Sequence, residues 1–223
     1  MVHPGQTLVP GPDSGLWLLD AQAVDHATYK RFGHCLDTQE RSRIATLTAT
    51  RWIRGLVIAR GFVRHVLGDL LDLAPDAVAI TRTPCTHCGG PHGLAQAPGL
   101  HFSLSHGRDD QAQEMLLLAV GTQPVGADIA HPAAYAGDLA ARLHPRDQAE
   151  LATSPDRAEH LAALARARLG ALGKARGTGL TCGPAPAYVG TSTVPARGHD
   201  GWVISDVEVP GRWCAAVARA VTS

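Results

Sequence analysis

The fold of this chain is decided by the stretch LHFSL at residues 100–104, in which apolar and polar residues alternate. Such alternation is typical of a β-strand. Apolar runs at 115–120 and 125–129 predict two more strands, and the turn GTQP at 121–124 separates them. The centre of the chain is therefore predicted to be rich in β-structure.

The residues before this centre predict helices. Asp37, followed by Glu40 three positions later, has the capping-box pattern that opens a helix. A longer helix is expected next, because apolar residues recur there at steps of three and four. They are Trp52, Ile53, Leu56, Val57, Val63, Val66, Leu67 and Leu70. Short strands are expected at 16–19 and 77–81, and residues 83–99, which are rich in Gly and Pro, are expected to form a loop.

The same order of elements recurs after the centre. Helices are expected over 138–151 and 156–176. Strands are expected at 187–189, 202–209 and 213–221. Each half then contains strand, helix and strands, so the sequence predicts an α+β fold built from two halves, 1–110 and 111–223, with the joint in a polar run near 108–114.

Composition excludes several classes of protein. The 223 residues are 45% hydrophobic, which is enough for a sizeable core. Twenty basic and twenty acidic residues balance, whereas a protein that binds nucleic acid or an acidic membrane normally has a basic excess. No signal peptide is evident, and no apolar run approaches the ~18 residues that span a membrane. Five cysteines, few and odd in number, favour a reduced, cytoplasmic setting.

Five motifs occur in an order that is characteristic of one family. They are ARGFVRHVLG at 59–68, CGGPHG at 88–93, FSLSH at 102–106, VGADI at 125–129 and KARGTGL at 174–180. Together they resemble the surfactin-type 4'-phosphopantetheinyl transferases over about residues 37–181. The resemblance implies two pseudo-twofold related α+β halves that hold coenzyme A and Mg²⁺ between them. It also implies transfer of phosphopantetheine to a serine of an acyl or peptidyl carrier protein, by a chain that works as a monomer.

The chain departs from the family at the expected metal site. The strand that normally carries an Asp and a Glu has Asp128 followed by Ala130, and the helix that normally carries another Glu has Gly170 in its place. Arg166 replaces the family's Trp. Mg²⁺ prefers hard oxygen ligands, so Asp128 alone is a weak site. Loss of a general base typically costs ~10²–10⁴-fold in rate, so we expect the ancestral transfer to be lost.

Several polar residues of the family site are retained. The resemblance implies that Ser105 and His106 contact phosphates of coenzyme A and a catalytic water, and that Lys174 binds phosphate. Arg43 and Arg54 match positions that meet the nucleotide phosphates. We expect His106, Asp128 and Lys174 to be catalytic, with Asp128 orienting or tuning His106 as an acid or base.

Three functions remain open from the sequence. The first is a protein of polyketide or nonribosomal peptide biosynthesis that uses metal-free acid/base chemistry, such as a cyclisation, on a carrier-bound or released intermediate, and requires no cofactor. The second is an active transferase that uses coenzyme A and Mg²⁺. The third is a non-catalytic pseudoenzyme that binds a carrier protein.

The loop before residue 93 adds one further alternative. Cys85 and Cys88 form a Cys-x-x-Cys pair, and His87 or His92 can supply further zinc ligands. No second cysteine pair lies at zinc-finger spacing, and the resemblance implies a loop that is not catalytic. Zinc binding at this loop is therefore left as an alternative.

Overall fold

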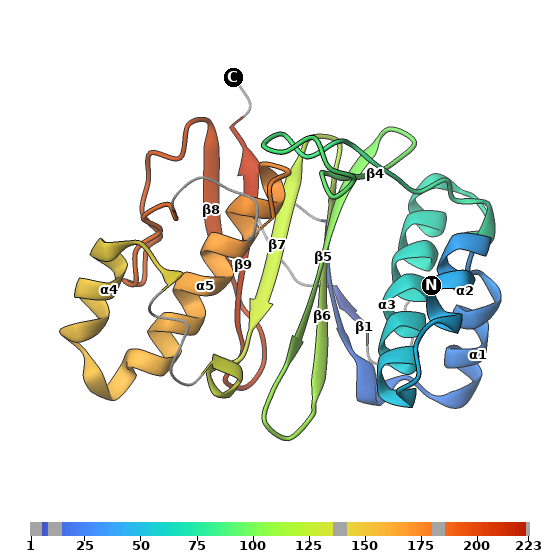
Figure 1. The fold of residues 1–223 in the computed structure, drawn as a ribbon, viewed down its shortest axis with the longest axis horizontal. Helices are drawn as coiled ribbons and strands as arrows, with labels where there is room; N and C mark the ends of the chain where they lie inside the picture. The colour runs from blue at the N-terminus through green and yellow to red at the C-terminus, as the bar shows by residue number, and fades with distance from the viewer. Residues whose placement is uncertain (1–5, 9–14, 136–141, 180–185, 222–223) are drawn as a thin grey trace.

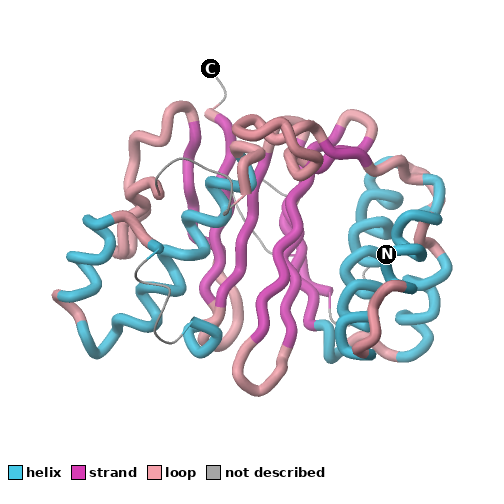
Figure 2. The backbone as a smooth tube through the Cα atoms, in the orientation of Figure 1, coloured by secondary structure: helices cyan, strands magenta, loops and turns pink. Residues whose placement is uncertain are grey.

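The computed structural model of the chain describes residues 6–8, 15–135, 142–179 and 186–221. It shows two antiparallel β-sheets stacked between two groups of helices, in four layers (Figure 1, Figure 2). In Figure 1 the helices α1–α3 lie on the right, the sheets in the middle and α4 and α5 on the left. The α+β class predicted from the sequence is confirmed.

The first sheet has six strands in the order β1-β2-β6-β5-β4-β3. Their bounds are β1 Gln6–Leu8, β2 Leu16–Asp20, β3 Thr81–Arg82, β4 Ala95–Ala97, β5 Leu100–Arg108 and β6 Glu114–Gly121. Strand β5 is the alternating stretch that the sequence analysis began with, and it continues four residues beyond the predicted end. It forms a hairpin with β6, in which Ser105 lies opposite Leu117 and His106 opposite Leu116.

Three helices accompany this sheet, with bounds α1 His26–His34, α2 Thr38–Ala45 and α3 Thr50–Leu71. The capping box predicted at Asp37 is present, since its side chain accepts from the backbone N–H of Glu40 while Glu40 accepts from that of Asp37. Helix α3 buries the middle of the apolar stripe predicted for it, whereas Trp52 and Leu70 at its two ends are exposed. The helix is capped by Asp72, whose φ of 54° is left-handed. Short 3₁₀ turns occur at Ala21–Ala23 and Pro75–Ala77.

The second sheet has the order β7-β9-β8, with bounds β7 Val125–Ala130, β8 Trp202–Val207 and β9 Cys214–Ala220. Two helices accompany it, α4 Pro145–Ala152 and α5 Ala158–Ala175, with 3₁₀ turns at Pro132–Tyr135 and Pro155–Arg157. Helix α5 packs closely on β7. A Cβ at Gly126 would overlap the backbone of Ala171, so only glycine permits this approach.

Three apolar clusters separate the layers. One lies between α3 and the first sheet and includes Phe62, Phe102 and Leu118. A second lies between the facing surfaces of the two sheets and includes Leu117 and Ile129. The third, rich in alanine, lies between the second sheet and α5. Since alternate residues of a strand point to opposite faces, β5 faces α3 with one set of side chains and β7 with the other.

Four predictions about the elements need correction. Residues 83–99, which were expected to form a loop, contain strand β4 at Ala95–Ala97. Residues 77–81 form no strand beyond the first residue of β3, because Pro75–Ala77 is a 3₁₀ turn. Residues 187–189 form no strand. Strand β6 belongs to the first sheet, so the passage between the sheets lies at 122–124 and not near 108–114, which is the turn of the β5–β6 hairpin. The predicted helix over 138–151 lies partly outside the described residues; within them, α4 begins at Pro145.

Candidate functional site

Asp128 lies on β7 with its carboxylate buried against α5. Its Oδ1 accepts hydrogen bonds from Ser105 Oγ and Lys174 Nζ, both at 2.6 Å. Its Oδ2 accepts one from Arg166 Nη1 at 2.5 Å. A buried carboxylate that pairs with two cations and a hydroxyl is neutralised and hydrogen-bonded on both oxygens.

The two cations come from one face of α5. Arg166, Gly170 and Lys174 follow one another at four-residue steps, so they share the side of the helix that faces β7. A Cβ built at Gly170 would overlap Asp128 Oδ2 and Arg166 Nη1. The guanidinium of Arg166 therefore fills the space beside Asp128 that a longer side chain at position 170 would need.

Lys174 joins the two sheets. Its ammonium donates to the carbonyl oxygens of Leu104 on β5 at 3.3 Å and Ala127 on β7 at 3.0 Å, and to Asp128. An ammonium has three N–H donors, and each of these contacts uses one of them. To bind a phosphate as predicted, Lys174 would have to give up at least one of these three hydrogen bonds.

Ser105 also acts between the sheets. Strand β7 is an edge strand of its sheet, so one side of its backbone needs partners from elsewhere. The N–H of Ala127 donates to Ser103 Oγ at 3.0 Å, and the N–H of Ile129 donates to Ser105 Oγ at 3.2 Å. The two hydroxyls on β5 thus satisfy the free edge of β7, and Ser105 is buried there.

These contacts do not fit a magnesium ion. Mg²⁺ needs an octahedron of oxygen donors at about 2.0–2.1 Å. Among the residues that the structure describes, Asp128 is the one carboxylate in this set of contacts; Ala130 and Gly170 offer no side-chain oxygen, and two cationic groups already contact Asp128. A divalent cation would have to displace at least one of them. We therefore derive no chemistry through magnesium for this chain.

His106 lies on the other face of β5, toward α3. Its Nε2 is 3.4 Å from Glu114 Oε2, and its side chain is 34% exposed whereas that of Glu114 is 15% exposed. Position 55 of α3 is glycine, and a Cβ there would come within 4 Å of both side chains. The predicted pairing of His106 with Asp128 is wrong, because adjacent residues of a strand point to opposite faces and Ser105 faces Asp128.

A cavity of about 270 Å³ lies between α3, β5 and the end of α5; Leu104, two residues before His106 on β5, lines it, whereas His106 and Glu114 do not. Its lining joins apolar residues to basic ones. The apolar residues include Leu56, Val63, Leu94, Phe102 and Leu104, and the basic ones are Arg60, Arg82, His92 and Lys174. Such a lining suits a ligand with an apolar body and an anionic end.

Three arginines lie near one another at this cavity. The pKa of Arg82 lies below its usual value, first because of desolvation and then because the charges of Arg60 and Arg43 lie nearby. Arg60 is 3.9 Å from Glu40, which also pairs with the buried Arg64 at 2.8 Å. The structure thus brings Arg43 close to two arginines that the sequence analysis did not select. We name Arg43, Arg60 and Arg82 the arginine cluster.

Arg54 has different surroundings. Its guanidinium donates to the carbonyl oxygens of Ala21 and Val24 at 3.3 Å and 2.9 Å, and it lies over the ring of Tyr29. These contacts anchor the segment before α1 to α3. These contacts with Ala21, Val24 and Tyr29 do not support the ligand-binding role predicted for Arg54.

Arg82 and Glu114 were not predicted from the sequence as site residues. The signal for Glu114 is the hairpin register: His106 lies opposite Leu116, so the residue two positions before Leu116 is its diagonal neighbour on the same face. No comparable sequence pattern predicted Arg82, because its position in the cavity lining depends on the fold of the loop that follows it.

No protein-family model matches the chain, and no curated protein matches it significantly. Among the described helices, none combines the length and the apolar character needed to cross a membrane.

Proposed function

We propose that this chain is a phosphopantetheinyl-transferase-like protein of polyketide or nonribosomal peptide biosynthesis that no longer catalyses the magnesium-dependent transfer. In this proposal the halves have the pseudo-twofold phosphopantetheinyl transferase fold and the cleft between α3 and β5 acts on a biosynthetic intermediate by metal-free acid/base chemistry. The observation that carries it is the pairing of Asp128 with Arg166 and Lys174, where the transfer would need a metal ion.

The cleft supports a ligand of the pantetheine type. A phosphopantetheine arm is a chain with amide groups and a phosphate at one end, and coenzyme A adds nucleotide phosphates. The arginine cluster offers positive charge to the phosphates, and the apolar wall, which includes Phe102 and Leu104, suits the arm. A carrier protein presents its intermediate on such an arm, so the proposed partner is an acyl or peptidyl carrier protein.

His106 and Glu114 are the proposed acid/base pair. Glu114 lies 3.4 Å from the ring nitrogen and fixes the orientation of the ring, while the 34% exposure of His106 leaves it open to a substrate. In a cyclisation, His106 would take a proton from the group that attacks and return it to the group that leaves.

The first prediction concerns the ancestral reaction. Incubation of the protein with coenzyme A, Mg²⁺ and an apo carrier protein is expected to leave the carrier mass unchanged, because the described partners of Asp128 are Ser105, Arg166 and Lys174 and include no second carboxylate. Intact-mass spectrometry measures this directly, with an active transferase as the positive control. A magnesium-dependent gain of the phosphopantetheine mass, in proportion to the protein added, would establish the active transferase instead.

The second prediction concerns the arginine cluster. Arg82→Gln is expected to weaken binding of coenzyme A by roughly tenfold, since a hydrogen bond to a charged group contributes about 1.5–3 kcal/mol. Isothermal titration calorimetry without magnesium gives the dissociation constants. Arg197→Gln is the matched control, because Arg197 is an exposed arginine outside the cavity lining. Equal affinities for Arg82→Gln and Arg197→Gln would remove the cavity as the binding site.

A non-catalytic role has one observation in its favour. Two of the three residues predicted to be catalytic, Asp128 and Lys174, use their polar atoms to hold β5, β7 and α5 together. In that case the cleft would bind a carrier protein without reaction. His106→Gln separates the two functions: it abolishes turnover of the carrier-bound intermediate if His106 is the acid/base group, and it leaves carrier binding unchanged in both cases.

A further inference from the structure

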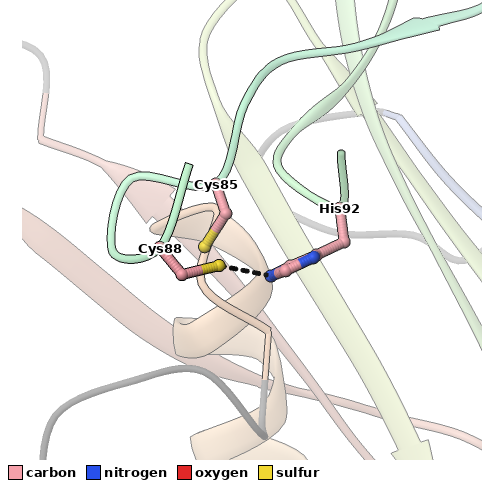
Figure 3. Close-up of side chains that lie close together, drawn as sticks. All are labelled: Cys85, Cys88 and His92. Carbon is pink, nitrogen blue, oxygen red and sulfur yellow. Dashed lines mark hydrogen bonds between the residues drawn. The ribbon is translucent and has the colours of Figure 1, made fainter. Parts of the chain in front are cut away.

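The loop between β3 and β4 gathers two thiols and an imidazole at one point. Figure 3 shows Cys85, Cys88 and His92 with their side chains directed toward one another. Their ligand atoms all lie within 4.8 Å of one another. Among the described residues, no other group of three or more His, Cys, Asp and Glu side chains converges in this way.

The spacing of these atoms fits a tetrahedral metal ion. Zinc binds thiolate sulfur at about 2.3 Å and imidazole nitrogen at about 2.0–2.1 Å, which places such a sulfur and nitrogen roughly 3.6 Å apart in a tetrahedron. Cys88 Sγ and His92 Nε2 are 3.4 Å apart. Two thiolates and an imidazole form a soft ligand set that selects zinc over magnesium or calcium.

The backbone of the loop is shaped around the three side chains. The N–H of Cys85 donates to Gly90 O at 2.7 Å, and the N–H of Gly89 donates to Cys85 O at 2.9 Å. Gly89 has a left-handed φ of 70°, which favours glycine. A Cβ at Gly90 would lie 2.9 Å from the ring of His92 and 3.3 Å from Cys88 Sγ. Glycine at position 90 therefore lets the ligand atoms come together.

The other cysteine–histidine pairs of the chain lack these features. Cys35 is 3.8 Å from His65, and Cys214 is 3.5 Å from His160, but no third ligand joins either pair among the described residues. Burial raises the pKa of each of these two thiols to about 11, so both stay protonated near neutral pH. In the Cys85–Cys88–His92 group, Cys85 is buried whereas Cys88 and His92 are exposed, so a metal ion can reach the group from solvent.

We infer that Cys85, Cys88 and His92 form a zinc site with water as the fourth ligand. The site is structural: it closes the loop whose residues His92, Gly93 and Leu94 line the cavity. The same loop reaches the other half of the molecule, since Thr86 Oγ donates to Arg176 O at 2.9 Å. A zinc ion here holds the wall of the cleft in place. The inference is independent of the proposed function, because it concerns a metal that takes no part in the acid/base chemistry.

The test uses the full chain, kept reduced, stripped with a chelator and then equilibrated with buffered zinc. We expect one zinc ion per chain by atomic emission, and a melting temperature that rises when zinc is restored. Cobalt in place of zinc is expected to show the near-ultraviolet thiolate-to-metal charge-transfer band and the visible bands of tetrahedral coordination. The cobalt spectrum reports the thiolate ligands themselves, so it does not depend on any activity of the protein.

Two variants and one control make the test specific. Cys88→Ser and His92→Ala are exposed substitutions that should leave the fold intact, and each is expected to abolish stoichiometric zinc and the response of the melting temperature. His34→Ala, at an exposed histidine of α1, is expected to bind zinc as the unaltered chain does. Two results would overturn the inference: an unaltered chain that binds no stoichiometric zinc, or zinc binding that survives both substitutions.

Discussion

Asp128→Asn is expected to lower the free energy of unfolding by about 3–5 kcal/mol, the usual cost of removing one partner of a buried ion pair. The substitution leaves Arg166 and Lys174 next to each other without the charge that holds them, and the side chain of Asp128 is only 6% exposed. The effect falls toward the lower end of that range, because Lys174 and Arg166 reach solvent in part. Urea unfolding followed by two spectroscopic probes measures the change.

The matched control is Asp156→Asn, since Asp156 is an exposed acid just before α5. A substitution at such a surface position usually stays within about 0.5 kcal/mol. A double substitution, Asp128→Asn with Arg166→Met, is expected to cost less than the sum of the two single changes, because both remove the same contact. If Asp128→Asn proved as mild as Asp156→Asn, the carboxylate would not hold β7 to α5, and the main argument against a metal at this position would fail.

Arg168→Met is expected to destabilise the second half by a similar amount, about 3–5 kcal/mol. Its guanidinium is fully buried on the face of α5 away from the cleft, where it donates to both oxygens of Asp206 at 2.8 Å and 2.6 Å. It also donates to the carbonyl oxygens of Gly190 at 2.6 Å and Ser192 at 2.8 Å. Methionine fills much of the volume but makes none of these bonds, so the carbonyl groups of the 190–192 loop lose their partner.

Thermal and urea unfolding of Arg168→Met should both show the loss, and Arg157→Met is the control because Arg157 is exposed at the start of α5. Binding of coenzyme A to the folded Arg168→Met protein is expected to stay unchanged, since Arg168 does not line the cavity. A loss of affinity without a loss of stability would contradict the structural role given to Arg168.

The secondary structure was predicted best where a local pattern determines it. The capping box at Asp37 and the apolar stripe of α3 are both present, because hydrogen bonds within a few residues and burial of one helix face are enough to form them. Residues 187–189 show the limit of this reasoning. They read as a strand by composition, but the N–H groups of Val189 and Gly190 donate to Asp147 on α4, so these groups bond outside any sheet.

The candidate site was predicted only in part. Ser105 and Lys174 were expected beside Asp128, and the structure places them there. The loss of carboxylates at Ala130 and Gly170 was also visible in the sequence. The sequence did not show that Arg166 occupies the space beside Asp128. Arg166 stands out in the sequence only as a replaced tryptophan, and its hydrogen bond to Asp128 depends on how α5 packs on β7.

The amino-acid sequence alone determined the α+β class and the loss of carboxylates at positions 130 and 170, because both follow from residue types and short-range periodicity. The tertiary structure alone decided which groups share a site. It separated His106 from Asp128, gave His106 the partner Glu114 and brought Arg82 to Arg43 and Arg60. The reason is geometric: neighbouring residues of β5 face opposite layers, and only the packing of those layers determines what each side chain meets.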